Sequence, residues 1–128
     1  MTSDWRLAVE AADLSAIDEQ LAAGADIDAR DQHGQTALMN AARDGQVAVV
    51  RLLADRGADL NHHAKWGLTA LMLAVIRGHA EVVRVLVDAG ADTTLQGTGA
   101  PAFHGKTAAD LAGERGDAAM QRLISSGK

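Results

Sequence analysis

The chain has 128 residues, of which 48% are hydrophobic and 23% are charged, a composition typical of one compact, ordered domain. It contains no cysteine, which excludes disulfides, thiolate zinc sites and cysteine nucleophiles. The formal net charge is −5, and this excess of acid disfavours nucleic acid as a partner, because phosphate contacts need a basic face.

The amino-terminal segment is strongly acidic. Residues 1–31 contain eight acidic residues against Arg6 and Arg30, a net charge of −6, whereas the rest of the chain has a net charge of +1. This segment either steers a basic partner or forms a solvated cap. The first residues lack the basic and apolar regions of a signal peptide, and no apolar run approaches the ~20 residues of a membrane span. We therefore expect a cytoplasmic protein that does not contact membranes.

Short sequences recur along the chain at a constant spacing. The tripeptide Gly-Ala-Asp begins at Gly24, Gly57 and Gly90, so each copy starts 33 positions after the one before it. The segment from Gly34 to Met39 returns at the same spacing as Gly67 to Met72. A fixed period of this length predicts a solenoid of paired helices in which each unit covers its neighbour. We divide the chain, as a single domain, into four units at about residues 1–30, 31–63, 64–96 and 97–128.

The first unit differs from those that follow. It lacks their Gly-x-Thr turn, and Ser3 stands where they have threonine. Trp5 takes the position that Leu38 holds one period later, so we expect its indole to fill the core of the end unit. Gln20 replaces the apolar Leu53, a change suited to a cap at the end of a stack.

The second unit shows how each helix pair is specified. Thr36 precedes an apolar run, where its hydroxyl can accept a hydrogen bond from a free N–H group at a helix start. We predict a first helix from about Ala37 to Asp44, ended by Gly45 in the left-handed conformation. A second helix follows from about Val47 to Asp55. The third unit repeats this pattern from Thr69.

The fourth unit is preceded by a longer loop. Gly57 and Gly67 are ten residues apart, whereas Gly90 and Gly105 are fifteen apart, which indicates a five-residue insertion within residues 96–103. The inserted segment contains the only proline, several glycines and Phe103. It is either a contact element or a tolerated mobile insertion.

These motifs resemble those of the ankyrin-repeat family. The segment from Asp31 to Ala42 follows the family pattern Asp-x-x-Gly-x-Thr-Pro-Leu-His-x-Ala-Ala, with alanine in place of proline and Met39 in place of histidine. Met72 makes the same replacement in the third unit, so we expect apolar packing where the family has a Thr–His hydrogen bond. The resemblance implies an all-α fold, an α-solenoid of helix-turn-helix units joined by projecting β-turn loops.

No cluster of residues predicts catalysis or metal binding. His33 and His104 are equivalent turn residues two units apart, roughly 20 Å if stacked helices lie about 8–10 Å apart. His62 and His63 are adjacent in one turn. No serine lies in a nucleophile-elbow sequence, and Gly97-Thr98-Gly99 is too short for a phosphate-binding loop. We expect no enzyme activity, no cofactor and no metal.

The resemblance also implies that a protein partner binds the concave side, which is formed by the turns and the first helix of each unit. The candidate contact residues are His33, Gln35, Arg43, Lys65, Trp66, Leu68, Ile76, Arg77, Phe103 and His104. Trp66, Leu68 and Ile76 are large apolar residues at positions expected to face water, which predicts a recognition patch. We expect Trp66 to anchor the partner, with Phe103 reaching over from the long loop. The alternative is that Trp66 folds back on the neighbouring turn.

Three functions are compatible with the sequence. The favoured one is a protein-interaction module that acts as a scaffold or inhibitor and is itself monomeric. The second is a structural or self-associating repeat protein, in which Trp66 and Phe103 form a contact between copies. The third, an enzyme or metal-dependent protein, has least support. The sequence does not identify the partner, because one fold serves many partners.

Overall fold

The computed structural model describes residues 1–126, which form eight α-helices and one 3₁₀ turn. The helices are α1 (Ser3–Glu10), α2 (Leu14–Ala22), α3 (Ala37–Asp44), α4 (Val47–Asp55), α5 (Ala70–Arg77), α6 (Ala80–Asp88), α7 (Ala108–Glu114) and α8 (Ala118–Ser126), with the 3₁₀ turn η1 (Lys65–Gly67) before α5. The predicted bounds of α3 and α4 are confirmed. Residues 127 and 128, which the predicted fourth unit includes, lie outside the described residues.

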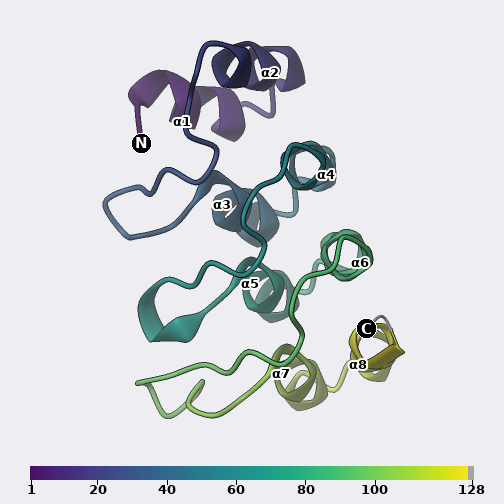
Figure 1. Cartoon of the computed structure of the whole chain (residues 1–128). Helices are drawn as coiled ribbons and strands as arrows, with labels where there is room; N and C mark the ends of the chain where they lie inside the picture. Colours follow the sequence, from purple (N-terminus) through teal and green to yellow (C-terminus); the bar gives the residue numbers. More distant parts are fainter. Residues whose placement is uncertain (127–128) are drawn as a thin grey trace.

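The helices form pairs that stack in chain order (Figure 1). The inner helices α1, α3, α5 and α7 pack on one another in one column, and the outer helices α2, α4, α6 and α8 form a second. Loops that join one pair to the next project beyond the inner column. The predicted all-α solenoid is therefore confirmed, and the projecting loops lie next to one another along one side of the stack.

Each inner helix begins at a threonine whose hydroxyl accepts a main-chain hydrogen bond. These N-cap residues are Thr2, Thr36, Thr69 and Thr107. Sequence equivalence pointed to Ser3 in the first unit, but Thr2 is the cap and accepts from the nitrogen of Trp5 at 3.2 Å. Helix α1 therefore begins one position earlier than the repeat period, counted back from Ala37 at the start of α3, would place it.

The inner helices are followed by a residue in the left-handed conformation. Gly45, Gly78 and Gly116 have φ angles of 76°, 77° and 77°. Ala12 occupies the same place in the first unit with φ 54°. A residue with a side chain pays about 1–2 kcal/mol to adopt this left-handed conformation. The junction between α1 and α2 is therefore strained, whereas the equivalent glycines of the later units are not.

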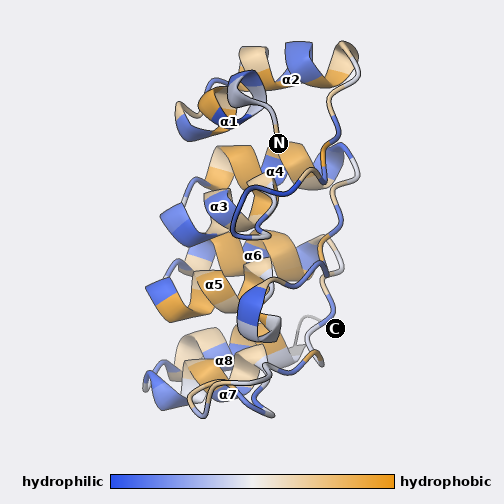
Figure 2. Ribbon diagram, turned by 90° about the vertical axis from the view of Figure 1, so that its left-hand side faces the viewer, coloured by the Kyte–Doolittle hydropathy of each residue, from blue (hydrophilic) through white to orange (hydrophobic). Residues whose placement is uncertain are grey.

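Apolar side chains of the inner and outer helices form one buried core. Trp5 is 1% exposed, which confirms its expected place in the core of the end unit. Met39 and Met72 are also buried, so apolar packing replaces the Thr–His hydrogen bond of the family pattern. Hydrophobic residues concentrate along α3, α4, α5 and α6, as expected for units covered on both sides (Figure 2).

Each unit also caps the inner helix that precedes it. Helix ends leave carbonyl groups without an intrahelical partner. The carbonyl oxygens of Glu10, Arg43 and Ile76, which are one repeat period apart, accept hydrogen bonds at 3.3, 3.0 and 3.0 Å from the side chains of Gln46, His79 and Arg115. These bonds fix neighbouring inner helices in register, and with them the turns that they carry.

Candidate functional site

Trp66 lies at the tip of the turn that precedes α5, called here the third turn, with its side chain exposed to solvent. The residue is 41% exposed, in contrast to the buried Trp5. Its backbone in η1 has φ 63° and ψ 23°, a left-handed conformation that is unfavourable for any residue with a Cβ atom. His33, the equivalent residue of the second unit, does not have a positive φ. The third turn therefore presents its indole from a backbone conformation specific to this unit.

The long loop (residues 96–106) reaches back and contacts Trp66. The main-chain nitrogen of Thr98 donates to the carbonyl oxygen of Trp66 at 2.7 Å. The Phe103 ring lies with its centroid 5.8 Å from that of the indole, at an interplanar angle of 32°. Gly97 closes the loop by donating to the carbonyl of Lys106 at 2.9 Å and accepting from Gly105 at 2.9 Å. The five inserted residues thus form a support for the third turn.

Lys65 also contacts the indole. Its ammonium nitrogen is 4.6 Å from the centroid of the Trp66 ring, a distance suited to a cation–π contact. Lys65 is itself exposed. The indole therefore contacts both a cation and Phe103, with part of its surface still open to solvent.

A cleft of about 490 Å³ lies between the turns of the second and third units. It is lined by Gln32, His33 and Gln35 from one turn and by Ala64, Lys65, Trp66 and Leu68 from the other. His33 is exposed, and its main-chain nitrogen donates to Asp31 at 2.8 Å. The cleft is thus lined by polar side chains from the second unit and by Trp66 and the apolar Leu68 from the third.

The apolar patch is narrower than the sequence indicated. Leu68 is only 8% exposed, so the expectation that it faces water is wrong. It lies directly before the buried N-cap Thr69, where its side chain packs against the core. Ile76 is half-buried and packs partly on the core, whereas Arg77, the last residue of α5, is exposed. Trp66 and Ile76 therefore supply the accessible apolar surface, and Leu68 lies beneath it.

One pair of positions distinguishes the third unit from its neighbours. In the second unit, Arg43 donates through Nη1 to the side-chain oxygen of Gln35 at 3.1 Å. In the fourth, Lys106 forms an ion pair with Glu114 at 2.6 Å. The same positions of the third unit hold Leu68 and Ile76. The second and fourth units therefore each have a polar side-chain pair at these two positions, whereas the third unit has two apolar residues.

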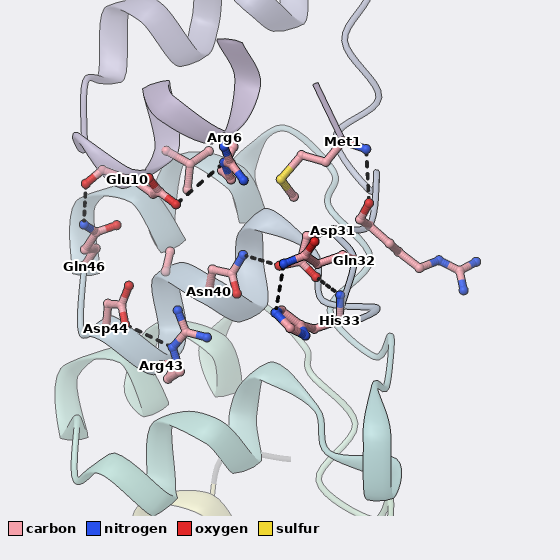
Figure 3. Close-up of a pocket in the computed structure, with 13 residues that line it drawn as sticks. Met1, Arg6, Glu10, Asp31, Gln32, His33, Asn40, Arg43, Asp44 and Gln46 are labelled. Carbon is pink, nitrogen blue, oxygen red and sulfur yellow. Dashed lines mark hydrogen bonds and ion pairs between the residues drawn. The ribbon is translucent and has the colours of Figure 1, made fainter. Parts of the chain in front are cut away.

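A second cleft of about 590 Å³, between α1 and α3, is polar (Figure 3). The carboxylate of Asp31 accepts hydrogen bonds from the nitrogens of His33 and Gln35 and from the Asn40 amide. Burial raises the pKa of Asp31, but these hydrogen bonds outweigh it, so that its pKa lies below the ordinary value. The Asn40 Oδ1 atom is buried and has no hydrogen-bond partner among residues 1–126.

Several of the charges that line this polar cleft are paired with one another. Arg43 contacts Asp44 at 3.1 Å, and Arg6 contacts Glu10 at 3.9 Å (Figure 3). Arg30, which also lines the cleft, is exposed and forms no ion pair within residues 1–126. The turn that carries Trp66 is the better candidate for a binding surface, because it combines Lys65 with an exposed indole.

The remaining candidates flank the third unit. His104 is exposed on the long loop, where its nitrogen donates to the carbonyl of Ala100 at 2.9 Å. Within residues 1–126, no three histidine or acidic side chains lie close enough together to hold a metal ion. The helices described in this part of the chain are also too short or too polar to span a membrane.

Comparison with known families identifies the fold class. A family model for ankyrin repeats, in three copies, matches residues 5–97. The chain belongs to the ankyrin-repeat family. A search of curated proteins found no match. The matched region includes Trp66 and its turn but ends at Gly97, so most of the long loop and the last helix pair lie beyond it.

Proposed function

We propose that this protein is an interaction module that binds a protein partner on its concave side, as a scaffold or an inhibitor, with Trp66 as the central contact. Ankyrin repeats are generally protein-interaction modules and typically have no enzymatic activity. The proposal includes the whole chain as one domain that acts as a monomer in the cytoplasm. The observation that carries it is the exposed, left-handed Trp66.

Two properties of Trp66 favour a binding role. Tryptophan is among the residues most enriched at binding hot spots, because its ring buries a large area on contact. A side chain that is already held in one orientation also loses less entropy on binding. Thr98 and Phe103 hold the third turn and the indole in this way. A strained backbone in an exposed turn is a feature that occurs at functional sites.

The other candidate residues surround this centre. Leu68 and Ile76 are the other apolar residues of this unit, and Lys65 and Arg77 are its cations. The flanking positions are occupied by His33, Gln35, Arg43, Phe103 and His104. We expect these residues to contribute shape and polar complementarity, with smaller individual effects than Trp66.

A capture experiment tests this function. The wild-type protein, Trp66→Ala and Leu14→Ala are immobilised separately and exposed to extract of the native cell. Leu14 is a matched control, because it is a large apolar residue that is also 41% exposed but lies on the first helix pair. We expect one protein that wild type and Leu14→Ala retain and Trp66→Ala loses. Equal retention by all three would contradict the assignment to Trp66.

Light scattering tests the proposed oligomeric state. We expect a monomer at micromolar concentration for the wild-type protein. A dimer that Trp66→Ala dissociates would instead favour the alternative of self-association through Trp66 and Phe103.

A further inference from the structure

Two cations of the third unit, one at each end of its turn and inner helix, form no ion pair within residues 1–126. Lys65 precedes the indole, and Arg77 ends helix α5 next to Ile76. Both side chains are exposed, and neither forms an ion pair within the described part of the chain. The only ring or charge contact of Lys65 among residues 1–126 is with the indole itself.

The acidic groups of the same surface are engaged within the chain. Asp31 accepts three hydrogen bonds in its own turn, from the nitrogens of His33 and Gln35 and from Asn40. Asp44 is paired with Arg43 and Glu114 with Lys106. The surface around Trp66 therefore has unpaired positive charge, although the chain as a whole carries −5.

Two apolar residues lie between these cations in the sequence of the third unit. Ile76 is half-buried beside Arg77, and Leu68 forms the base of the cleft that Lys65 lines. In the neighbouring units, the residues at the positions of Leu68 and Ile76 are paired with each other, by the Gln35–Arg43 hydrogen bond and the Lys106–Glu114 ion pair. The third unit thus offers a partner both an apolar contact and two cations.

We propose that the segment of the partner that binds here is an acidic peptide with one apolar side chain at its centre. The apolar side chain contacts Trp66 and Ile76, and flanking carboxylates pair with Lys65 and Arg77. This inference rests on the proposed function and specifies its partner. Charge complementarity is its basis, because opposite charges on two surfaces raise both the rate and the specificity of association.

A second copy of this chain is the competing occupant, since residues 1–31 carry a net charge of −6. Its acids are distributed over two helices and their turns and not along one extended strand. Several of them are also engaged, since Asp13 caps α2 and Asp18 is paired with Arg56 at 3.0 Å. We therefore favour a peptide segment and treat self-association as a separate outcome of the test.

The test uses three fluorescein-labelled heptapeptides with leucine at the centre and three identical residues on each side: glutamate, glutamine or lysine. Binding to the full chain is measured by fluorescence anisotropy at low and at physiological salt. We expect the glutamate peptide to bind about tenfold more tightly than the glutamine peptide at low salt, with a difference that narrows as salt screens the charges. The lysine peptide should not bind.

Charge-reversal variants locate the contact. Lys65→Glu and Arg77→Glu should each weaken binding of the glutamate peptide by at least about threefold. Arg51→Glu is the matched control, because Arg51 is an exposed arginine on the outer helix α4 that also forms no ion pair within the described residues. It should change the affinity by less than about twofold.

Three results would overturn the inference: no binding of the glutamate peptide at millimolar concentration, equal binding of the lysine peptide, or equal weakening by Arg51→Glu. A dimer at low salt that Lys65→Glu dissociates would also overturn it, in favour of a second copy. These failures are distinct from failure of the proposed function. If the peptides do not bind but Trp66→Ala still abolishes capture of the native partner, only the acidic partner is wrong.

Discussion

The main-chain nitrogen of Thr98 donates a 2.7 Å hydrogen bond to the carbonyl oxygen of Trp66, and so joins the long loop to the turn before it. This contact links two residues that lie almost one full repeat period apart in the sequence. It places the five-residue insertion beneath the exposed indole. The insertion therefore acts on the binding surface by positioning Trp66, in addition to any contact that it makes itself.

Gly97→Ala should separate Phe103 from Trp66. A Cβ atom at Gly97 would clash with the carbonyl oxygen of Phe103 and lie 2.8 Å from its Cβ atom, so the loop cannot close in its present form. We expect acrylamide to quench the indole fluorescence more strongly, since the response comes from Trp66 while Trp5 is buried. Ala102→Ser, at an exposed residue of the same loop, is the control. Unchanged quenching in Gly97→Ala would show that the loop does not support the indole.

Ala12→Gly should stabilise the protein. Ala12 has φ 54° where the later units have glycine, so glycine relieves backbone strain. The gain should be about 0.5–1 kcal/mol after the larger entropy of glycine in the unfolded chain is included. Urea unfolding measures it. The opposite change, Gly45→Ala, should destabilise by at least about 2 kcal/mol, because the new Cβ is strained and meets the His79 ring at 2.7 Å. A loss of stability in Ala12→Gly would contradict this account.

His79→Ala should weaken the stack between the second and third units. It removes the 3.0 Å hydrogen bond to the carbonyl oxygen of Arg43 at the end of α3. The expected loss is about 1 kcal/mol in the free energy of unfolding. His79→Gln should restore most of it, because Gln46 makes the same bond to Glu10 one unit earlier. Equal losses in both variants would indicate that the ring acts through packing and not through the hydrogen bond.

Asp31→Asn should reduce stability at neutral pH but not in acid. The folded-state pKa of Asp31 is below its ordinary value of 3.8, so its carboxylate stabilises the protein above that pH. This contribution is lost as the pH falls through the folded-state pKa. Because solvent screens this partly exposed group, we expect a difference of only about 0.5–1 kcal/mol from wild type at pH 7, shrinking below about pH 4. The control is Asp55→Asn, the same substitution at an exposed residue whose side chain forms no hydrogen bond or ion pair among the described residues.

The helices that the sequence predicted correctly are those with local signals at both ends. Thr36 and Gly45 bound α3 through contacts within a few residues, and the repeat period transfers this logic to Thr69 and Gly78. Trp5 was predicted to lie in the core because its repeat position specifies burial. Where the first helix departs from the period by one residue, Thr2 is the N-cap in place of the equivalent residue Ser3.

The binding surface was less predictable, because its decisive contacts join distant residues. Trp66 and Phe103 were recognised as candidates, but the left-handed backbone of Trp66 occurs together with a hydrogen bond from Thr98 that no local pattern indicates. The burial of Leu68 was not predicted, because it also depends on packing against the core. Comparison of Leu68 and Ile76 with Gln35 and Arg43 could have indicated that these positions face each other across the inner helix.

The affinity of the captured partner for Trp66 variants tests the central claim most directly. Titration calorimetry should show that Trp66→Ala weakens binding by roughly 2 kcal/mol or more, about 30-fold, while thermal unfolding shows that the variant remains folded. Trp66→Asn, which tolerates the left-handed backbone, should lose the same affinity with no loss of stability from strain. Leu14→Ala should bind as the wild type does. Wild-type affinity in both Trp66 variants would contradict the claim that this indole is the centre of the binding surface.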